Sequence, residues 1–202
     1  MKHLLRRMIR SGFDWKIPIR NGVGLLIILT ACVETNVEPT PIVLQSYPVE
    51  RPTTIELADE TDPSQRLVIN GTIYANNHHT LVSGAFITVW HTDAEGRYGT
   101  YRGTGQSDGQ GNYQLKTIVP SSYQVDDTTK RAAHIHFEIS AVGMRPVSGE
   151  ILFEGDPDLK IDPVVLETAP EVLATRIIPL KIVEGPSGSY LQGRFDLILL
   201  PP

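Results

Sequence analysis

Two histidines, His134 and His136, stand one residue apart in the run Arg131–Phe137. The surrounding segment alternates in polarity and is rich in β-branched and aromatic residues, a pattern typical of a β-strand. Successive side chains of a strand point to opposite faces, so both imidazoles project the same way and Ile135 projects the other way. Two imidazoles on one rigid strand face would make half of a metal site.

The elements that must position such a pair are predicted to be strands. The body of the chain, residues 67–202, shows short apolar or alternating runs separated by turns, and no stretch has a helical stripe. Many short strands at this spacing predict an all-β fold, a β-sandwich in a single domain. The expected strands cover residues 67–74, 85–90, 113–118, 134–139, 150–153, 177–183 and 193–200.

The start of the chain has the pattern of a targeting segment. Residues 1–22 are basic, a short apolar run follows at 23–29, and small residues precede Cys32. The apolar run is far below the roughly 20 residues that a spanning helix needs. We therefore expect a signal peptide at 1–31. The sequence 29–32 resembles a bacterial lipobox, which predicts lipidation of Cys32, a membrane anchor and a place in the cell envelope; an ordinary signal cut elsewhere is the alternative.

The segment 32–66 is rich in Pro, Thr, Glu and Asp and predicts a flexible tether. Removing residues 1–31 takes away six basic residues and one acidic residue, so 12 of 18 basic and 22 of 23 acidic residues remain. A body this acidic argues against nucleic acid as a partner. Cys32 is the only cysteine, so the fold cannot depend on internal disulfides.

Several dispersed motifs of the body resemble, in the same order, those of the intradiol ring-cleavage dioxygenases, the family of protocatechuate 3,4-dioxygenase and catechol 1,2-dioxygenase. Together they cover nearly all of residues 67–200. The matching segments are Gly71–Ile73, Gly84–Tyr98 (with Trp90-x-x-Asp93-x-x-Gly96-x-Tyr98), Tyr101–Gly103, Ser107–Tyr113, Thr117–Tyr123, Arg131–Phe137, Phe153–Pro157 and Phe195–Leu197.

The resemblance implies a site and a reaction. In that family, Fe(III) is held by two tyrosinates and two histidines, which at the matching positions are Tyr98, Tyr123, His134 and His136. Anionic phenolate oxygens suit a hard ferric ion. The implied reaction cleaves a catechol-type ring with O2 to a muconate-type product, without an organic cofactor. Tyr123 would leave the metal and take a substrate proton, and Arg131 would be a fixed cation that stabilises negative charge on the ring.

Some positions depart from the family pattern. Ala132 replaces the usual proline, and Glu150 stands where the larger enzymes carry a glutamine. Only 25 residues separate Tyr98 from Tyr123, which predicts a trimmed loop and an open site. Tyr101 competes with Tyr98 as a ligand but lacks the spacing of the motif. The helical dimerisation domain of catechol 1,2-dioxygenases is not found, so the oligomeric state is open.

The remaining candidate residues have plainer interpretations. We expect His78, His79 and His91 to be solvated residues of turns or strand ends, and Trp90 to pack in the core. Two other functions remain open. A metal-free, transthyretin-like sandwich would serve as a binding or adhesion module at the cell envelope. A zinc or copper site on the histidine pair would need a third ligand other than tyrosine, and no suitable acid motif is expected.

Overall fold

The computed structural model describes residues 53–202, with the exception of residue 77. The predicted signal peptide (1–31), Cys32 and the first part of the predicted tether lie outside the described residues. Within the part that the structure describes, no helix combines the length and the apolar character that crossing a membrane requires.

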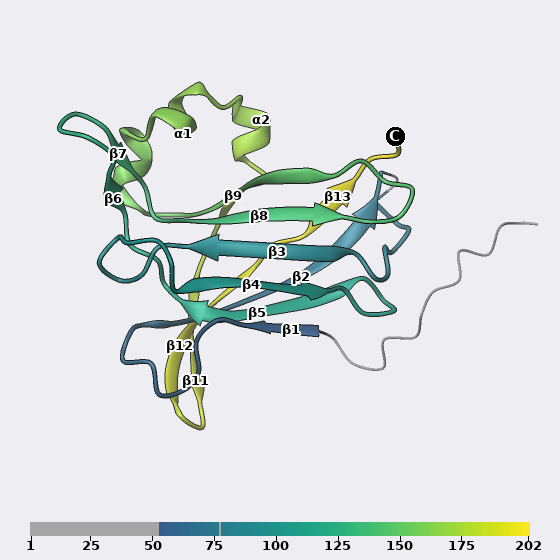
Figure 1. Cartoon of the computed structure of the whole chain (residues 1–202), viewed down its shortest axis with the longest axis horizontal. Coiled ribbons are helices and arrows are strands. Elements are labelled where there is room, and N and C mark those ends of the chain that lie inside the picture. The colour runs from purple at the N-terminus through teal and green to yellow at the C-terminus, as the bar shows by residue number, and fades with distance from the viewer. Residues whose placement is uncertain (1–52, 77) are drawn as a thin grey trace, which may run out of the picture. The chain divides into compact units, whose positions relative to one another are not determined.

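Two β-sheets face one another and form a sandwich (Figure 1). The strand order of the first sheet is β1 (Thr53–Glu56), β5 (Asn112–Ile118), β2 (Arg66–Ala75), β12 (Gly188–Arg194) and β11 (Lys181–Gly185), with β13 (Leu197–Leu199) paired to the end of β2. The order of the second is β10 (Ile177–Ile178), β9 (Val147–Phe153), β8 (His134–Ser140), β3 (Phe86–His91) and β4 (Tyr101–Gln106). A small ribbon joins β6 (Tyr123–Gln124) to β7 (Lys130–Arg131). The predicted β-sandwich is confirmed.

The core lies between the two sheets, and β8 shows how it is built. Ile135 and Phe137 point inward and are buried, as is Leu67 on the opposite sheet. Because side chains alternate along a strand, His134 and His136 project from the other face of the second sheet. The apolar half of β8 therefore stabilises the fold, while its polar half is presented to the loops that cover that face.

Within residues 53–202 as described, three short helical turns interrupt the strands, contrary to the expectation of an all-strand body. They are η1 (Pro157–Lys160), α1 (Pro163–Glu167) and α2 (Pro170–Leu173), which Figure 1 shows together with β6 and β7 beyond one end of β9. Each has a proline in its first turn, and Asp156 and Asp162 cap η1 and α1. A single turn is too short to show a helical period, so hydrophobic periodicity could not reveal these elements.

The predicted boundary between tether and domain at residue 67 is wrong. Strand β1 lies within the supposed tether, pairs in parallel with β5 and buries Ile55 to 2% exposure. It approaches β4 so closely that a Cβ on Gly103 would lie 2.6 Å from Leu57 Cδ2, and one on Gly105 would lie 2.6 Å from Ile55 Cγ1. Burial of Ile55 and Leu57 outweighs the polar composition around them, so the folded domain includes residues 53–66.

Two of the expected strands are each divided into two in the structure. Residues 177–178 pair with β9 in the second sheet, whereas residues 181–185 pair with β12 in the first. Pro179, which has no N–H to donate, stands at this crossing. Residues 193–200 divide between β12 and β13, but both of these strands pair with β2.

Candidate metal centre

The histidine pair occupies the outer face of β8. His134 is 2% exposed, and its Nδ1 lies 2.6 Å from the carbonyl oxygen of Ala132. Since a carbonyl only accepts, Nδ1 carries the proton and the Nε2 lone pair is directed away from the strand. The Nε2 atoms of His134 and His136 are 3.1 Å apart. The two imidazoles thus converge, as their spacing predicted.

Two tyrosines reach the same point from loops. After β3, Asp93 Oδ1 accepts two backbone N–H groups of its own turn at 2.9 Å. Gly96 has φ +78° in this turn, and a Cβ there would lie 3.0 Å from Tyr123 Cβ. A side chain at residue 96 would therefore strain the backbone and crowd the second tyrosine. The Asp-x-x-Gly-x-Tyr spacing closes a tight turn that delivers Tyr98 beside Tyr123.

The four predicted ligand side chains meet around the hydroxyl of Tyr98. Its Oη lies 3.3 Å from Tyr123 Oη, 3.3 Å from His134 Nε2 and 3.0 Å from His136 Nε2. These donors come from a loop after β3, from β6 and from β8, three segments well separated in sequence. Only the tertiary fold brings them into contact.

Tyr101 and His91 lie on the inner face of the second sheet, away from this cluster. Tyr101 is buried, donates to Asp62 Oδ2 at 2.6 Å and stacks on His91; it is therefore no rival to Tyr98. His91 was expected to be solvated, and that expectation is wrong, because it is fully buried. Its ring nitrogens lie 2.7 Å from the carbonyl oxygen of Thr92 and 2.6 Å from Thr117 Oγ1, which satisfies both.

The protonation states suit a metal site. Burial lowers the pKa of His136 to about 4, with a further contribution from neighbouring His134, and burial also lowers the pKa of His134. Both rings are therefore neutral near pH 7, as metal ligation requires. Burial and the hydrogen bond with Tyr123 raise the pKa of Tyr98. Tyr98 would thus need a nearby cation to become a phenolate.

Arg131 stands beside the cluster between two carboxylates. Its Nη2 donates to both oxygens of Glu150, at 2.7 and 2.6 Å, and its Nε donates to Asp162 at 3.1 and 3.0 Å. Burial alone would lower the pKa of Arg131, but the hydrogen bonds to Glu150 and Asp162 outweigh it and raise that pKa. The predicted fixed cation is present, but its charge is shared with two anions.

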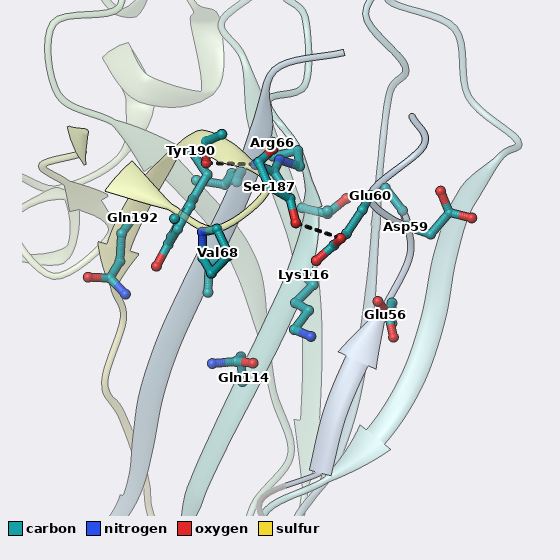
Figure 2. Close-up of a pocket in the computed structure, with 16 residues that line it drawn as sticks. Glu56, Asp59, Glu60, Arg66, Val68, Gln114, Lys116, Ser187, Tyr190 and Gln192 are labelled. Atoms are coloured by element: carbon teal, nitrogen blue, oxygen red, sulfur yellow. Dashed lines mark hydrogen bonds between the residues drawn. The ribbon is translucent and has the colours of Figure 1, made fainter. Parts of the chain in front are cut away.

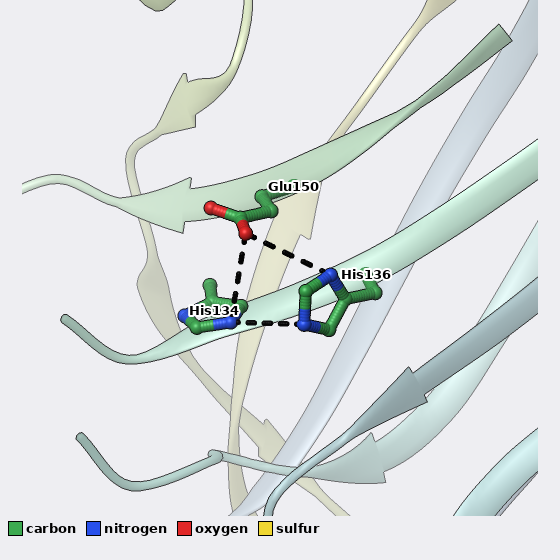
Figure 3. Close-up of side chains that lie close together, drawn as sticks. All are labelled: His134, His136 and Glu150. Atoms are coloured by element: carbon green, nitrogen blue, oxygen red, sulfur yellow. Dashed lines mark hydrogen bonds and ion pairs between the residues drawn. The ribbon is translucent and has the colours of Figure 1, made fainter. Parts of the chain in front are cut away.

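Glu150 creates a second possible set of metal ligands, which no sequence pattern indicated. Its carboxylate lies with His134 and His136 in a cluster whose potential ligand atoms are all within 4.8 Å of one another (Figure 3). Glu150 Oε1 is, however, 3.7 Å from His136 Nδ1, whereas His136 Nε2 faces Tyr98. One imidazole cannot direct both nitrogens at a single ion, and both oxygens of Glu150 already accept from Arg131. The tyrosine and histidine cluster is therefore the better metal site.

Trp90 was expected in the core, and that expectation is wrong. Ile87, Val89 and His91 alternate inward along β3, so Trp90 points to the outer face. There its indole stacks on His136, with ring centroids 4.9 Å apart and an interplanar angle of 12°. The Trp90 indole therefore forms an aromatic wall beside His136 and holds the His136 ring in place.

Asp162 is the main functional candidate that sequence reasoning missed. It is fully buried, accepts from Arg131 and from the Ala132 backbone N–H, and caps α1 through Val164 N at 2.8 Å. It thereby fixes the connection between β7 and β8 to the helices. The Asp-Pro sequence at 162–163, a helix-start signal, could have indicated the cap, but no sequence signal indicates the contact with Arg131.

A hollow of about 260 Å³ lies on the first sheet, away from the four predicted metal ligands (Figure 2). Its lining includes Arg66, Lys116, Gln114 and Tyr190. Arg66 Nη2 donates to the carbonyl oxygens of Ser187 and Gly188 at 2.8 Å and holds the β11–β12 turn at its rim. The residues that line it include none of the four that meet at Tyr98.

Comparison with known proteins finds relatives that are similar in sequence and in fold. Chlorocatechol 1,2-dioxygenase of Pseudomonas putida is 32% identical over 118 residues, which cover 48% of this chain and 45% of the relative. Catechol 1,2-dioxygenase 2 of Acinetobacter lwoffii is 31% identical over 125 residues, covering 51% and 45%. The crystal structure of catechol 1,2-dioxygenase from Pseudomonas arvilla C-1 superposes with a TM-score of 0.65 at 26% identity, over 73% of this chain and 56% of that one.

This chain spans about half the length of the curated relatives it matches. The match of a dioxygenase family model nevertheless extends over residues 40–201, which is most of the sequence. The family match includes the strands and turns that carry Tyr98, Tyr123, His134 and His136. The protein therefore belongs to the intradiol dioxygenase family.

Proposed function

We propose that this protein is a non-haem iron dioxygenase that cleaves a catechol-type ring with O2. The observation that carries the proposal is the convergence of Tyr123, His134 and His136 on the hydroxyl of Tyr98, within 3.0 to 3.3 Å. Two phenols and two neutral imidazoles form a donor set that suits a hard ferric ion, because phenolate oxygens stabilise its high charge. The residues present therefore fit the metal.

When bound, the ion would supply Lewis acidity, which favours the deprotonated form of a catechol and prepares its ring for reaction with O2. Overall, one O2 is added, the bond between the two hydroxylated carbons is broken, and both oxygen atoms enter a muconate-type diacid. This balance needs no external reductant.

The side chains of the chain have distinct tasks in the proposal. His134, held through Nδ1 by Ala132, and His136, stacked on Trp90, would be the fixed ligands together with Tyr98. Tyr123 belongs to the two-residue strand β6, outside both large sheets, and we assign it the role of the ligand that leaves the metal when substrate binds. Its Oη would take a proton from a substrate hydroxyl.

Arg131 borders the site through the same ribbon, since it is directly paired with Tyr123 in the β6–β7 register. Its Nε and Nη2 are used by Asp162 and Glu150. We assign Nη1 the role of donating to negative charge that develops on the ring. The two carboxylates hold the guanidinium rigidly, so this donor is preorganised.

The proposal is tested by the visible spectrum and iron content of the purified protein after ferric reconstitution. We expect a broad tyrosinate-to-iron charge-transfer band that shifts when catechol is added, followed by formation of the ring-opened diacid. Tyr98→Phe and Tyr123→Phe should change or abolish the band, whereas the matched control Tyr101→Phe should retain it. A colourless protein without iron would refute the proposal and favour the metal-free binding module. A colourless metal-loaded protein would favour the His134, His136 and Glu150 arrangement.

We further propose that Cys32 is lipidated and anchors the domain at the cell envelope. The support is the sequence alone: the lipobox-like 29–32 and the absence of any other cysteine from the chain. Metabolic labelling with a fatty acid in a bacterial host should label the wild-type protein. It should not label Cys32→Ser, and equal labelling of the two would contradict the proposal.

A further inference from the structure

The charges around the candidate site form an ordered row across the outer face of the second sheet. The strand register places Arg102 opposite Trp90, Trp90 opposite His136, and His136 opposite Glu150. Arg102 lies over the indole, 5.2 Å from the ring centroid, at one end of the row. At the other end, Glu150 meets Arg131. Glu150 therefore lies on the strand next to His136, whereas Arg102 lies two strands away, beyond Trp90.

The Arg131 group carries a formal charge of −1. One guanidinium is matched by two carboxylates, Glu150 and Asp162, and the three side chains are 12%, 12% and 0% exposed. A glutamine at 150 would keep an acceptor for Nη2 but would make the group neutral. Burial strengthens this difference, because charges at 0–12% exposure are poorly screened by solvent.

The cations beside these residues in the sequence do not offset the charge. Lys130 is 2.7 Å from Asp158, and Arg97 contacts both Asp93 and Glu95 at 2.8 Å. Arg102 is separated from the four donors by the Trp90 indole. Any ring that reaches the histidine nitrogens has the Glu150 carboxylate close by, since Oε1 is 3.7 Å from His136 Nδ1 and 3.8 Å from His134 Nε2.

We infer that Glu150 determines specificity by repelling a second anionic group, so that the site selects catechols whose ring substituents are uncharged or cationic. This inference rests on the proposed function, because it assumes that a catechol binds at the Tyr98 cluster. Like charges a few ångströms apart at a partly buried site weaken binding by roughly tenfold or more. Glu150 acts here through its charge and through the position it gives Arg131, without taking part in the reaction.

The test is an equilibrium titration of the ferric protein, under nitrogen so that no turnover occurs, followed by the visible band. The ligands are catechol, 3,4-dihydroxybenzoate and 4-(2-aminoethyl)catechol. We expect the wild type to bind the carboxylated ring at least about tenfold more weakly than catechol, and the ammonium-bearing ring about as well as catechol. Glu150→Gln should reduce the discrimination several-fold. Glu138→Gln, which removes an exposed carboxylate from the same face of β8, should leave it unchanged.

The outcomes separate the two proposals. Equal affinity of the wild type for catechol and the carboxylated ring would overturn the inference while leaving the proposed function intact. Discrimination that persists unchanged in Glu150→Gln, in a variant with normal iron content and thermal stability, would overturn it as well. Failure of the wild type to bind iron or any of the rings would overturn both. If Glu150→Gln does not fold, the wild-type preference, measured with all three rings, still decides the charge selection.

Discussion

Replacement of the buried His91 should remove a large part of the acid sensitivity of the fold. The pKa of His91 is lowered from 6.5 to about 4, first because of burial and then through nearby His134, against the opposing effect of the Thr92 carbonyl. As the pH falls below 6.5, the unfolded chain takes up a proton at this residue and the folded chain does not. The contribution of the neutral His91 to stability is thus fully present above pH 6.5 and is lost as the pH falls towards 4. Below pH 4 this contribution changes little further.

The size of this effect follows from the two pKa values. Their difference of 2.5, from 6.5 to about 4, corresponds to roughly 3 kcal/mol at 1.36 kcal/mol per pKa unit. Most of it, about 2 kcal/mol, should fall between pH 7 and pH 4.5. The hydrogen bonds of the ring with Thr92 and Thr117 are compatible with a neutral imidazole, which donates at Nδ1 and accepts at Nε2.

The assay is urea denaturation of the iron-free protein at pH 7 and pH 4.5, for the wild type and for His91→Gln. Glutamine supplies one donor and one acceptor but does not titrate. His134 and His136 also have lowered pKa values and are common to both proteins, so the difference between the two pH dependences reports His91 together with its electrostatic coupling to His134. We expect the variant to lose about 2 kcal/mol less than the wild type between the two pH values. Parallel pH dependences would refute the reasoning from burial.

Three further predictions concern other contacts of the fold. Ile55→Ala should lower the free energy of unfolding by about 2–4 kcal/mol, because Ile55 of β1 is part of the core. A loss below about 0.5 kcal/mol, measured by denaturation, would instead indicate that residues 53–66 are a dispensable tether. Tyr101→Phe should lower the free energy of unfolding by about 1 kcal/mol. The Tyr101 hydroxyl is the main cause of the lowered pKa of Asp62, so this pKa should rise in an NMR titration of the variant. An unchanged pKa of Asp62 would contradict the contact. Asp162→Asn should cost about 3 kcal/mol by leaving a buried guanidinium underpaired. The control Asp158→Asn, which breaks the more exposed pair with Lys130, should cost clearly less. Equal losses on thermal unfolding would disprove the distinction.

Much of the fold was predictable because strands that face one core alternate in polarity. The strands at β2, β3, β5 and β8 were expected within one or two residues of their observed bounds. The errors occurred where local pattern is weak. Strand β1 has only four residues in a polar setting, and the helical turns at 157–173 are too short to show a period.

The environment of the site was less predictable than its members. The motifs indicated four metal ligands, and the structure places them side by side: Tyr98, Tyr123, His134 and His136. The predicted positions of Trp90 and His91 were both wrong. Trp90 lies on the outer face of the second sheet, whereas His91 lies on its inner face. A shift of one residue in the expected alternation of β3 is enough to exchange them.

The amino-acid sequence by itself determined the strand pattern, the shared face of His134 and His136, and the turn at Asp93 and Gly96 that directs Tyr98. These are properties of neighbouring residues, and backbone geometry translates them directly into local structure. Only the tertiary structure decided that Glu150 and Asp162 both bind Arg131. That ion group joins β9, β7 and the start of α1, and its net charge depends on which side chains meet in space, which no local pattern encodes.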